Sequence, residues 1–126
     1  IMGIKLQVII LILIIHWVAD FVLQTDKEVK GKGKNWSDLL SHTYTYSLFW
    51  LFCGSLLSGY LGYDYAKIVL FVVITFICHT ITDYFTSRLN SKLWVKGDVH
   101  NFFLSIGFDQ VLHYVQLFVT YQILFG

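Results

Sequence analysis

Long apolar stretches without a single proline constrain what this chain can fold into more than any other feature. The first of them contains the unbroken apolar run Val8 to Ile15. Of the 126 residues, 56% are hydrophobic and only 13% are charged, too few to cover the water-exposed surface of a soluble domain of this size. Lipid removes that demand, so the sequence predicts one integral membrane domain over residues 1–126.

Four of these stretches are long enough to cross a hydrocarbon core about 30 Å thick. They cover residues 4–24, 36–58, 65–88 and 99–125. Ser37 or Asp38 is expected to cap the second helix, and Asp64 the third. The segments between helices one and two (25–35) and three and four (89–98) are polar and are expected to be loops. The predicted fold is an all-α, four-transmembrane-helix bundle with up-down-up-down topology.

Basic residues indicate the orientation of this bundle. Seven of the nine lysines and arginines lie in or beside the segments 25–35 and 89–98, and only Lys5 and Lys67 lie at the opposite helix ends. The positive-inside rule then places both segments in the cytoplasm and both termini on the non-cytoplasmic side. The first stretch is longer than the apolar part of a signal peptide, so we expect a multi-pass protein of the bacterial inner membrane without a cleaved signal. A net charge of +1 argues against nucleic-acid binding.

Histidines and aspartates recur in the apolar stretches at a spacing of four residues. Stretches one and three carry His-x-x-x-Asp, stretch four carries Asp-x-x-x-His, and stretch two carries a histidine four residues before Tyr46. This spacing places both members of a pair on one helix face. At about 1.5 Å per residue, all of them fall in one layer of the cytoplasmic half of the membrane. The seven candidate ligands are His16, Asp20, His42, His79, Asp83, Asp109 and His113.

Charge balance favours a metal site in this layer. Ionised aspartates at this depth cost several kcal/mol unless they are paired, and the sequence places no lysine or arginine at the same depth. Imidazole and carboxylate ligands suit zinc, manganese or iron, and seven ligands suit two ions that share a carboxylate. The structural alternative is that the same groups only form hydrogen bonds between helices.

Further roles follow from this interpretation. Asp20, Asp83 and Asp109 are the candidate catalytic carboxylates, one of which could act as the general base. Residues that could orient the ligands, or simply bond between helices, are Gln24, Tyr46 and Gln110. Two cations at a possible substrate entrance, which the positive-inside rule also explains, are Arg88 and Lys92.

Several motifs resemble one family of small bacterial and phage membrane proteins. They are HWVADFVLQTD at 16–26, the segment around His42, the pair His79 and Asp83, and FDQVLH at 108–113. The family is catalogued as domain of unknown function 3307, and the likeness covers nearly the whole chain. A broader similarity is to metal-dependent hydrolases of the inner membrane, which implies metal chemistry in a helical bundle without naming a substrate.

The leading hypothesis is a membrane-embedded metal-dependent hydrolase with a dinuclear site. Its substrate would be an ester or phosphoester, either lipid-linked or soluble, reached from the inner leaflet. One alternative is a protein that transports or senses divalent ions or protons. Another is a small scaffold whose polar groups bond between helices and whose partner is a second copy or another membrane protein.

Overall fold

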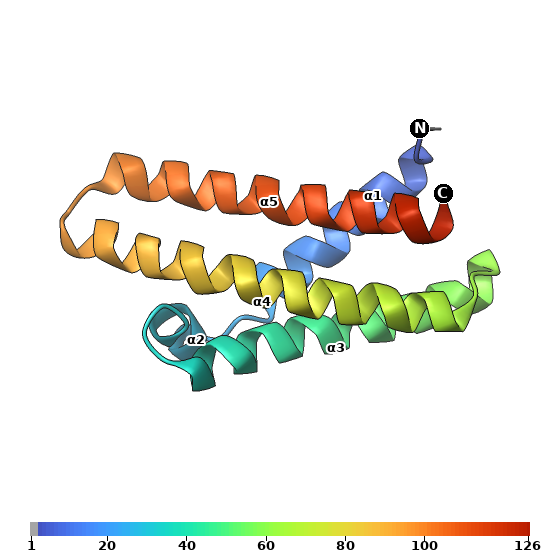
Figure 1. The fold of residues 1–126 in the computed structure, drawn as a ribbon, viewed down its shortest axis with the longest axis horizontal. Helices are drawn as coiled ribbons and strands as arrows, with labels where there is room; N and C mark the ends of the chain where they lie inside the picture. The colour runs from blue at the N-terminus through green and yellow to red at the C-terminus, as the bar shows by residue number, and fades with distance from the viewer. Residues whose placement is uncertain (1–2) are drawn as a thin grey trace.

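The computed structural model describes residues 3–126, and over this range the chain is helical and contains no strand (Figure 1). The first helix continues into one turn of π-helix, and the others are separated by short turns. The elements are α1 (Leu6–Trp17), the π-helix η1 (Val18–Val22), α2 (Asp26–Gly31), α3 (Trp36–Leu61), α4 (Tyr65–Val95) and α5 (Val99–Phe125).

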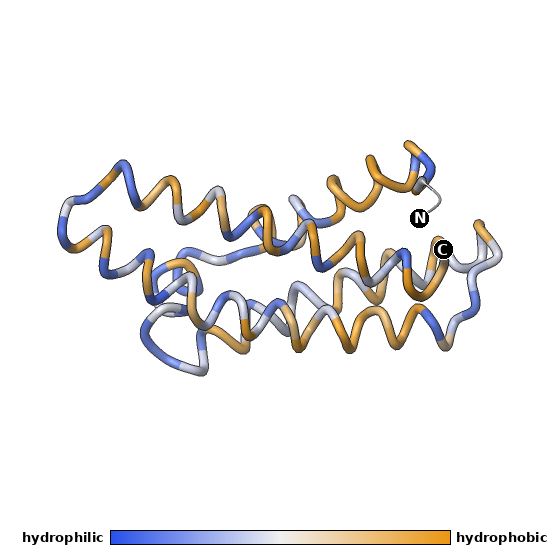
Figure 2. The backbone as a smooth tube through the Cα atoms, turned by 45° about the horizontal axis from the view of Figure 1, so that its top comes forward, coloured by the Kyte–Doolittle hydropathy of each residue, from blue (hydrophilic) through white to orange (hydrophobic). Residues whose placement is uncertain are grey.

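Helices α3, α4 and α5 run antiparallel along the long axis of the molecule, while α1 passes obliquely behind them (Figure 1). Most contacts between helices join α4 to α5 and α3 to α4, and α1 with η1 completes the bundle against α3 and α5. Both termini lie at one end, and α2 and the α4–α5 turn lie at the other. Figure 2 shows hydrophobic residues along most helical turns, with hydrophilic residues gathered around α2 and the α4–α5 turn.

Two of the helices, α4 and α5, are long and apolar enough to cross a membrane. The first apolar helix, Leu6–Val22, is shorter, and α3 does not reach the same apolarity although it has 26 residues. The physical reason lies in the first half of α3, where the run from Ser41 to Ser47 is rich in polar side chains. By length and apolarity the structure therefore supports two of the four expected spans.

Polar residues occupy the inside of this bundle and large apolar residues its outside. Among the described residues, fourteen polar or charged residues are buried against nine apolar ones. Large side chains such as Phe52, Leu56 and Phe103 are more than 60% exposed. In water this arrangement would lack a driving force, whereas lipid favours an apolar outer face around a paired polar interior.

Helix ends match the sequence at one turn and differ from it at another. Gly62 ends α3 with φ of 72°, a conformation that favours glycine, and the Asp64 carboxylate caps α4 by accepting from the backbone N–H of Ala66 at 3.0 Å. The predicted caps of α3 are wrong by two or three residues. Asn35 is the cap, and its side-chain oxygen accepts from the N–H of Asp38 at 2.8 Å.

The two basic segments are more helical than predicted. Segment 25–35 contains α2, which begins with a reciprocal capping box in which Thr25 and Glu28 each bond the other's backbone N–H. Helix α4 runs on through most of segment 89–98 because nothing in it breaks a helix before Gly97, whose φ is 72°. The helical backbone of both segments therefore sets the direction in which each charged side chain leaves the chain.

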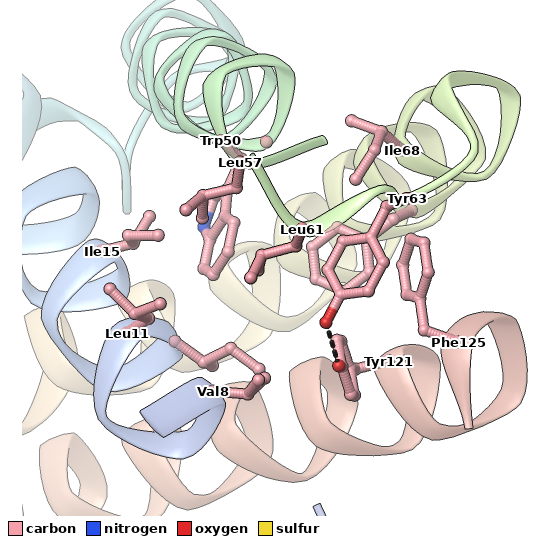
Figure 3. Close-up of a pocket in the computed structure, with 13 residues that line it drawn as sticks. Val8, Leu11, Ile15, Trp50, Leu57, Leu61, Tyr63, Ile68, Tyr121 and Phe125 are labelled. Carbon is pink, nitrogen blue, oxygen red and sulfur yellow. Dashed lines mark hydrogen bonds between the residues drawn. The ribbon is translucent and has the colours of Figure 1, made fainter. Parts of the chain in front are cut away.

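An apolar cavity lies among α1, α3, the start of α4 and the end of α5 (Figure 3). The space in it that a water-sized molecule could occupy amounts to about 60 Å³, and part of the cavity is open to the outside. Ile15 and Trp50 form its inner wall, and the hydroxyls of Tyr63 and Tyr121 bond to each other across it. Apolar packing thus fills this end of the bundle, and the polar interior begins just beyond Trp50.

Candidate metal centre

The structure brings all seven predicted ligand residues together inside the bundle. Each is at most 8% exposed, and they come from α1, η1, α3, α4 and α5. Asp20 lies in the π-helical turn, a feature that is frequent at functional sites. The four histidines all turn Nε2 toward the carboxylates.

Four of these residues form a compact group with the dimensions of a tetrahedral metal site: Asp20, His42, His79 and Asp83. Nε2 of His42 lies 3.2 Å from Nε2 of His79, and each nitrogen lies 3.2 Å from Oδ2 of Asp83. The same two nitrogens lie 3.0 and 3.5 Å from Oδ1 of Asp20. A tetrahedral ion with bonds of about 2.0 to 2.1 Å holds its ligand atoms about 3.3 to 3.4 Å apart. The donor set and its spacing therefore fit a divalent transition metal.

A second group with metal-ligand spacing lies beside the first and consists of Asp20, Asp109 and His113. Nε2 of His113 lies 3.2 Å from Oδ2 of Asp109 and 3.0 Å from Oδ1 of Asp83. Thr86 donates its hydroxyl hydrogen to Oδ1 of Asp109 at 2.6 Å. This group offers three protein ligands where the first offers four.

Asp20 belongs to both groups, and Asp83 of the first group also contacts a histidine of the second. Oδ1 of Asp20 faces His42 and His79, while its Oδ2 accepts from the side-chain amide of Gln110 at 3.1 Å. Asp83 divides its oxygens in the same way, with Oδ2 toward His42 and His79 and Oδ1 toward His113. Asp20, as the carboxylate shared by both groups, is placed where it can bridge two ions.

His16 lies at the edge of the cluster, outside both ligand groups. Its Nε2 is 2.7 Å from Oε1 of Gln110 and 3.6 Å from Oδ2 of Asp20. Its Nδ1 is 2.7 Å from the hydroxyl of Tyr46, whose ring also stacks on His79 with centroids 3.9 Å apart. Tyr46 and Gln110, the two residues expected to orient ligands, therefore both contact His16.

Lys32 closes the cluster from the side of α2. Its Nζ lies 3.5 Å from Oδ2 of Asp83, and its side chain is only 19% exposed. Burial lowers its pKa, but the Asp83 carboxylate and its neighbours outweigh burial and raise the pKa of Lys32 above the ordinary 10.5. The expectation that no basic residue reaches this depth is wrong, because α2 and the following turn fold the lysine back over the helices.

Three other predicted residues lie elsewhere. Gln24 makes no bond to the cluster, and its Oε1 is buried without a partner. The guanidinium of Arg88 lies over the ring of Tyr84, 3.7 Å from its centroid, where a cation–π contact stabilises it. Lys92 is exposed on α4. Within residues 3–126, the cation at the cluster is thus Lys32, not the two predicted at an entrance.

Sequence reasoning missed Lys32 and Thr86, for different reasons. Thr86 follows Asp83 by three residues, so the helical period alone places it on the same face of α4. Lys32 lies between two glycines in a segment expected to be a loop, and no period applies there. Its inward direction depends on contacts with α3 and α4 that only the folded chain reveals.

Comparison with known proteins identifies the family of the chain. No curated protein and no solved structure matches the chain. No match supports the broader similarity to metal-dependent hydrolases. The matching family is described as "Protein of unknown function (DUF3307)", and the match extends over residues 8–126. Because this is nearly the whole sequence, the chain belongs to the DUF3307 family.

Proposed function

We propose that this protein is a membrane-embedded, metal-dependent hydrolase with a dinuclear centre. The observation that carries the proposal is the spacing of Asp20, His42, His79 and Asp83. The two histidine nitrogens lie 3.2 Å from each other and 3.0 to 3.5 Å from oxygens of both carboxylates. Hydrogen bonds alone do not require two imidazoles and two carboxylates to converge on one point. A shared cation of about 2 Å bond length does.

The membrane location rests on the packing described above. Two helices can cross a membrane, and large apolar side chains cover the outside of a polar interior. A multi-pass arrangement of α1 with η1, α3, α4 and α5 would place the cluster inside the bundle, with α2 at the cytoplasmic surface. The positive-inside rule supports that orientation, since the lysines of 25–35 all lie in or beside α2.

The two ligand groups suit different roles. Four protein ligands close a metal position, whereas three leave a place for water or substrate, as in catalytic zinc sites. We therefore assign the chemistry to the position of Asp20, Asp109 and His113. A divalent ion there supplies Lewis-acid polarisation and lowers the pKa of water enough to provide a nucleophile near neutral pH.

In this scheme one carboxylate of the chain accepts the proton, and other side chains orient the ligands. Asp109 has the most exposed side chain of the three carboxylates, at 11% against 4% for Asp20 and 2% for Asp83. Water enters most easily beside it, so Asp109 would bind the ion through Oδ2, the oxygen that faces His113, and take the proton of the attacking water at Oδ1. Tyr46 and Gln110 hold His16, and Gln110 in turn fixes Oδ2 of Asp20.

Hydrolysis by the purified protein in lipid nanodiscs tests the proposal. A chromogenic phosphomonoester and a chromogenic carboxylic ester would be offered to zinc-, manganese- and iron-loaded protein, with and without a chelator. The expected result is turnover of one substrate that stops on metal removal and returns on metal addition. Asp83→Asn should abolish turnover and bound metal together, because an amide replaces one of the four ligands of the first group and also the carboxylate that contacts His113 of the second.

Asp26→Asn is the matched control, since Asp26 is an exposed carboxylate at the start of α2. It should leave metal content and turnover unchanged. A folded wild-type protein that takes up metal but hydrolyses neither substrate class would remove the catalytic part of the proposal.

Divalent-ion transport is a second candidate, and one observation favours it. Beyond the cluster, toward the termini, Gln116 donates to Thr75 at 3.1 Å and to Thr120 at 3.0 Å, which extends the polar interior. Buried Phe71 and Leu117 also occupy this part of the bundle. Metal flux into sealed proteoliposomes would favour transport, and retention of a stoichiometric metal without flux would favour the hydrolase.

A further inference from the structure

Lys32 differs from the other lysines of its segment in its direction. Lys27, Lys30 and Lys34 are exposed, whereas the Lys32 side chain is 19% exposed and its ammonium group lies 3.5 Å from Asp83. Among the described residues, no other lysine or arginine pairs with a carboxylate of the cluster; Lys27 pairs with Asp38, outside it. Burial of a charged group costs free energy, so the inward position of Lys32 must be stabilised by other contacts.

Two glycines hold Lys32 in this position. A side chain on Gly31 would collide with the carboxylate of Asp38, and one on Gly33 would lie 2.6 Å from the backbone oxygen of Ser87. The turn therefore packs directly onto α3 and α4 on both sides of the lysine. Ser87 adds a hydrogen bond from its hydroxyl to the carbonyl oxygen of Lys32 at 3.2 Å.

Two bound divalent ions would reverse the sign of the charge at the cluster. Without metal, the three aspartates exceed the single lysine, and Lys32 pairs with Asp83. Two divalent ions bring four positive charges against three carboxylates, and Lys32 adds one more, leaving about two in excess. Once metal neutralises Asp83, the ammonium group of Lys32 no longer has a free carboxylate to pair with, and its three N–H donors are available to another anion.

We propose that Lys32 binds the phosphate group of the substrate, an inference that rests on the proposed function and narrows it to phosphate esters. A phosphate monoester carries a charge of about −1.5 to −2 near pH 7, which matches the excess, whereas a neutral carboxylic ester does not. One phosphate oxygen can accept a hydrogen bond from the ammonium group of Lys32, while the other phosphate oxygens face the open ligand position. Lys32 and Asp109 retain the most exposed side chains in the cluster, so the phosphate would enter between them.

Phosphate binding to the zinc-loaded protein in phosphatidylcholine nanodiscs tests this role without relying on turnover. Inorganic phosphate would be titrated by calorimetry into wild type, Lys32→Met, Lys32→Arg and Lys34→Met, with zinc content measured for each. Lys32→Met should bind at least about tenfold more weakly at unchanged zinc content, as expected for loss of a hydrogen bond between charged groups. Lys32→Arg should retain most of the affinity, and the control Lys34→Met all of it.

A measurement on the wild type covers the case in which Lys32→Met fails to fold. Phosphate should slow acylation of Lys32, followed by mass spectrometry, and leave acylation of Lys34 unchanged. Equal phosphate affinity in a zinc-loaded Lys32→Met, or no protection of Lys32, would overturn the inference and leave the proposed function intact. A wild type that takes up no metal would instead overturn the proposed function, and this inference with it.

Competition identifies the source of the phosphate. Displacement of inorganic phosphate by phosphatidic acid placed in the nanodisc assigns the site to a lipid phosphate. Displacement by glycerol 3-phosphate alone assigns it to a soluble phosphomonoester. If neither ester displaces phosphate, the site does not accept phosphate esters and the inference is wrong.

Discussion

Gly33→Ala is expected to destabilise the protein although it adds only one methyl group. The new Cβ would lie 2.6 Å from the carbonyl oxygen of Ser87 and 2.6 Å from the hydroxyl oxygen of Ser91. The Ser87 carbonyl belongs to the backbone of α4 and cannot move aside cheaply, so the turn must move instead. Overpacking of this kind costs about 1 to 3 kcal/mol. The shift would also carry Lys32 away from Asp83.

Gly107→Ala provides the matched control in the same chain. Gly107 lies inside α5, and a methyl group added there would meet no neighbouring atom within 4 Å, so alanine should stabilise the helix by about 0.5 to 1 kcal/mol. The two variants should therefore differ by about 1.5 to 4 kcal/mol in the free energy of unfolding. Reversible unfolding in mixed micelles, followed by circular dichroism, measures this difference. A Gly33→Ala protein as stable as the Gly107→Ala protein would refute the reasoning about the turn.

Two further predictions test the lipid-facing surface and the second ligand group. Ile77 is 51% exposed on α4, so Ile77→Asp should destabilise the protein by about 2.5 to 3.5 kcal/mol if this face meets lipid and by less than about 0.5 kcal/mol if it meets water. Unfolding in bilayers, with Ile77→Ala as the control, distinguishes the two. Thr86→Val removes the hydroxyl that bonds Asp109 at 2.6 Å and should weaken one of two zinc-binding steps by about 10- to 100-fold. Competition with a chromophoric chelator measures both steps, and an equal loss in both would contradict the assignment of Asp109 to one group.

The spacing of residues in the sequence was sufficient to predict which side chains of one helix lie on the same face. In a helix, residues four apart share a face, so the pairs His79 with Asp83 and Asp109 with His113 needed no knowledge of the fold. The turn at Gly62 and the cap at Asp64 were predictable for a similar reason, since each depends on local chemistry alone. These features are set within one or two helical turns.

Features that depend on contacts between distant segments could not be predicted. The inward direction of Lys32 depends on how its turn packs against α3 and α4. The sequence also does not reveal that the helix widens into a π-turn at Asp20, or that His16 turns toward Gln110. The positive-inside rule assigns Arg88 to a side of the membrane, but its contact with Tyr84 is a tertiary detail.

The central claim is that the buried histidines and aspartates hold two metal ions. Elemental analysis combined with X-ray absorption on protein purified without chelator tests it most directly. The account predicts about two divalent transition-metal ions per chain, a shell of nitrogen and oxygen ligands at about 2.0 to 2.1 Å, and a second metal at about 3.5 to 4 Å. A folded protein that contains no stoichiometric metal after reconstitution would contradict it and leave the cluster as a set of hydrogen bonds between helices.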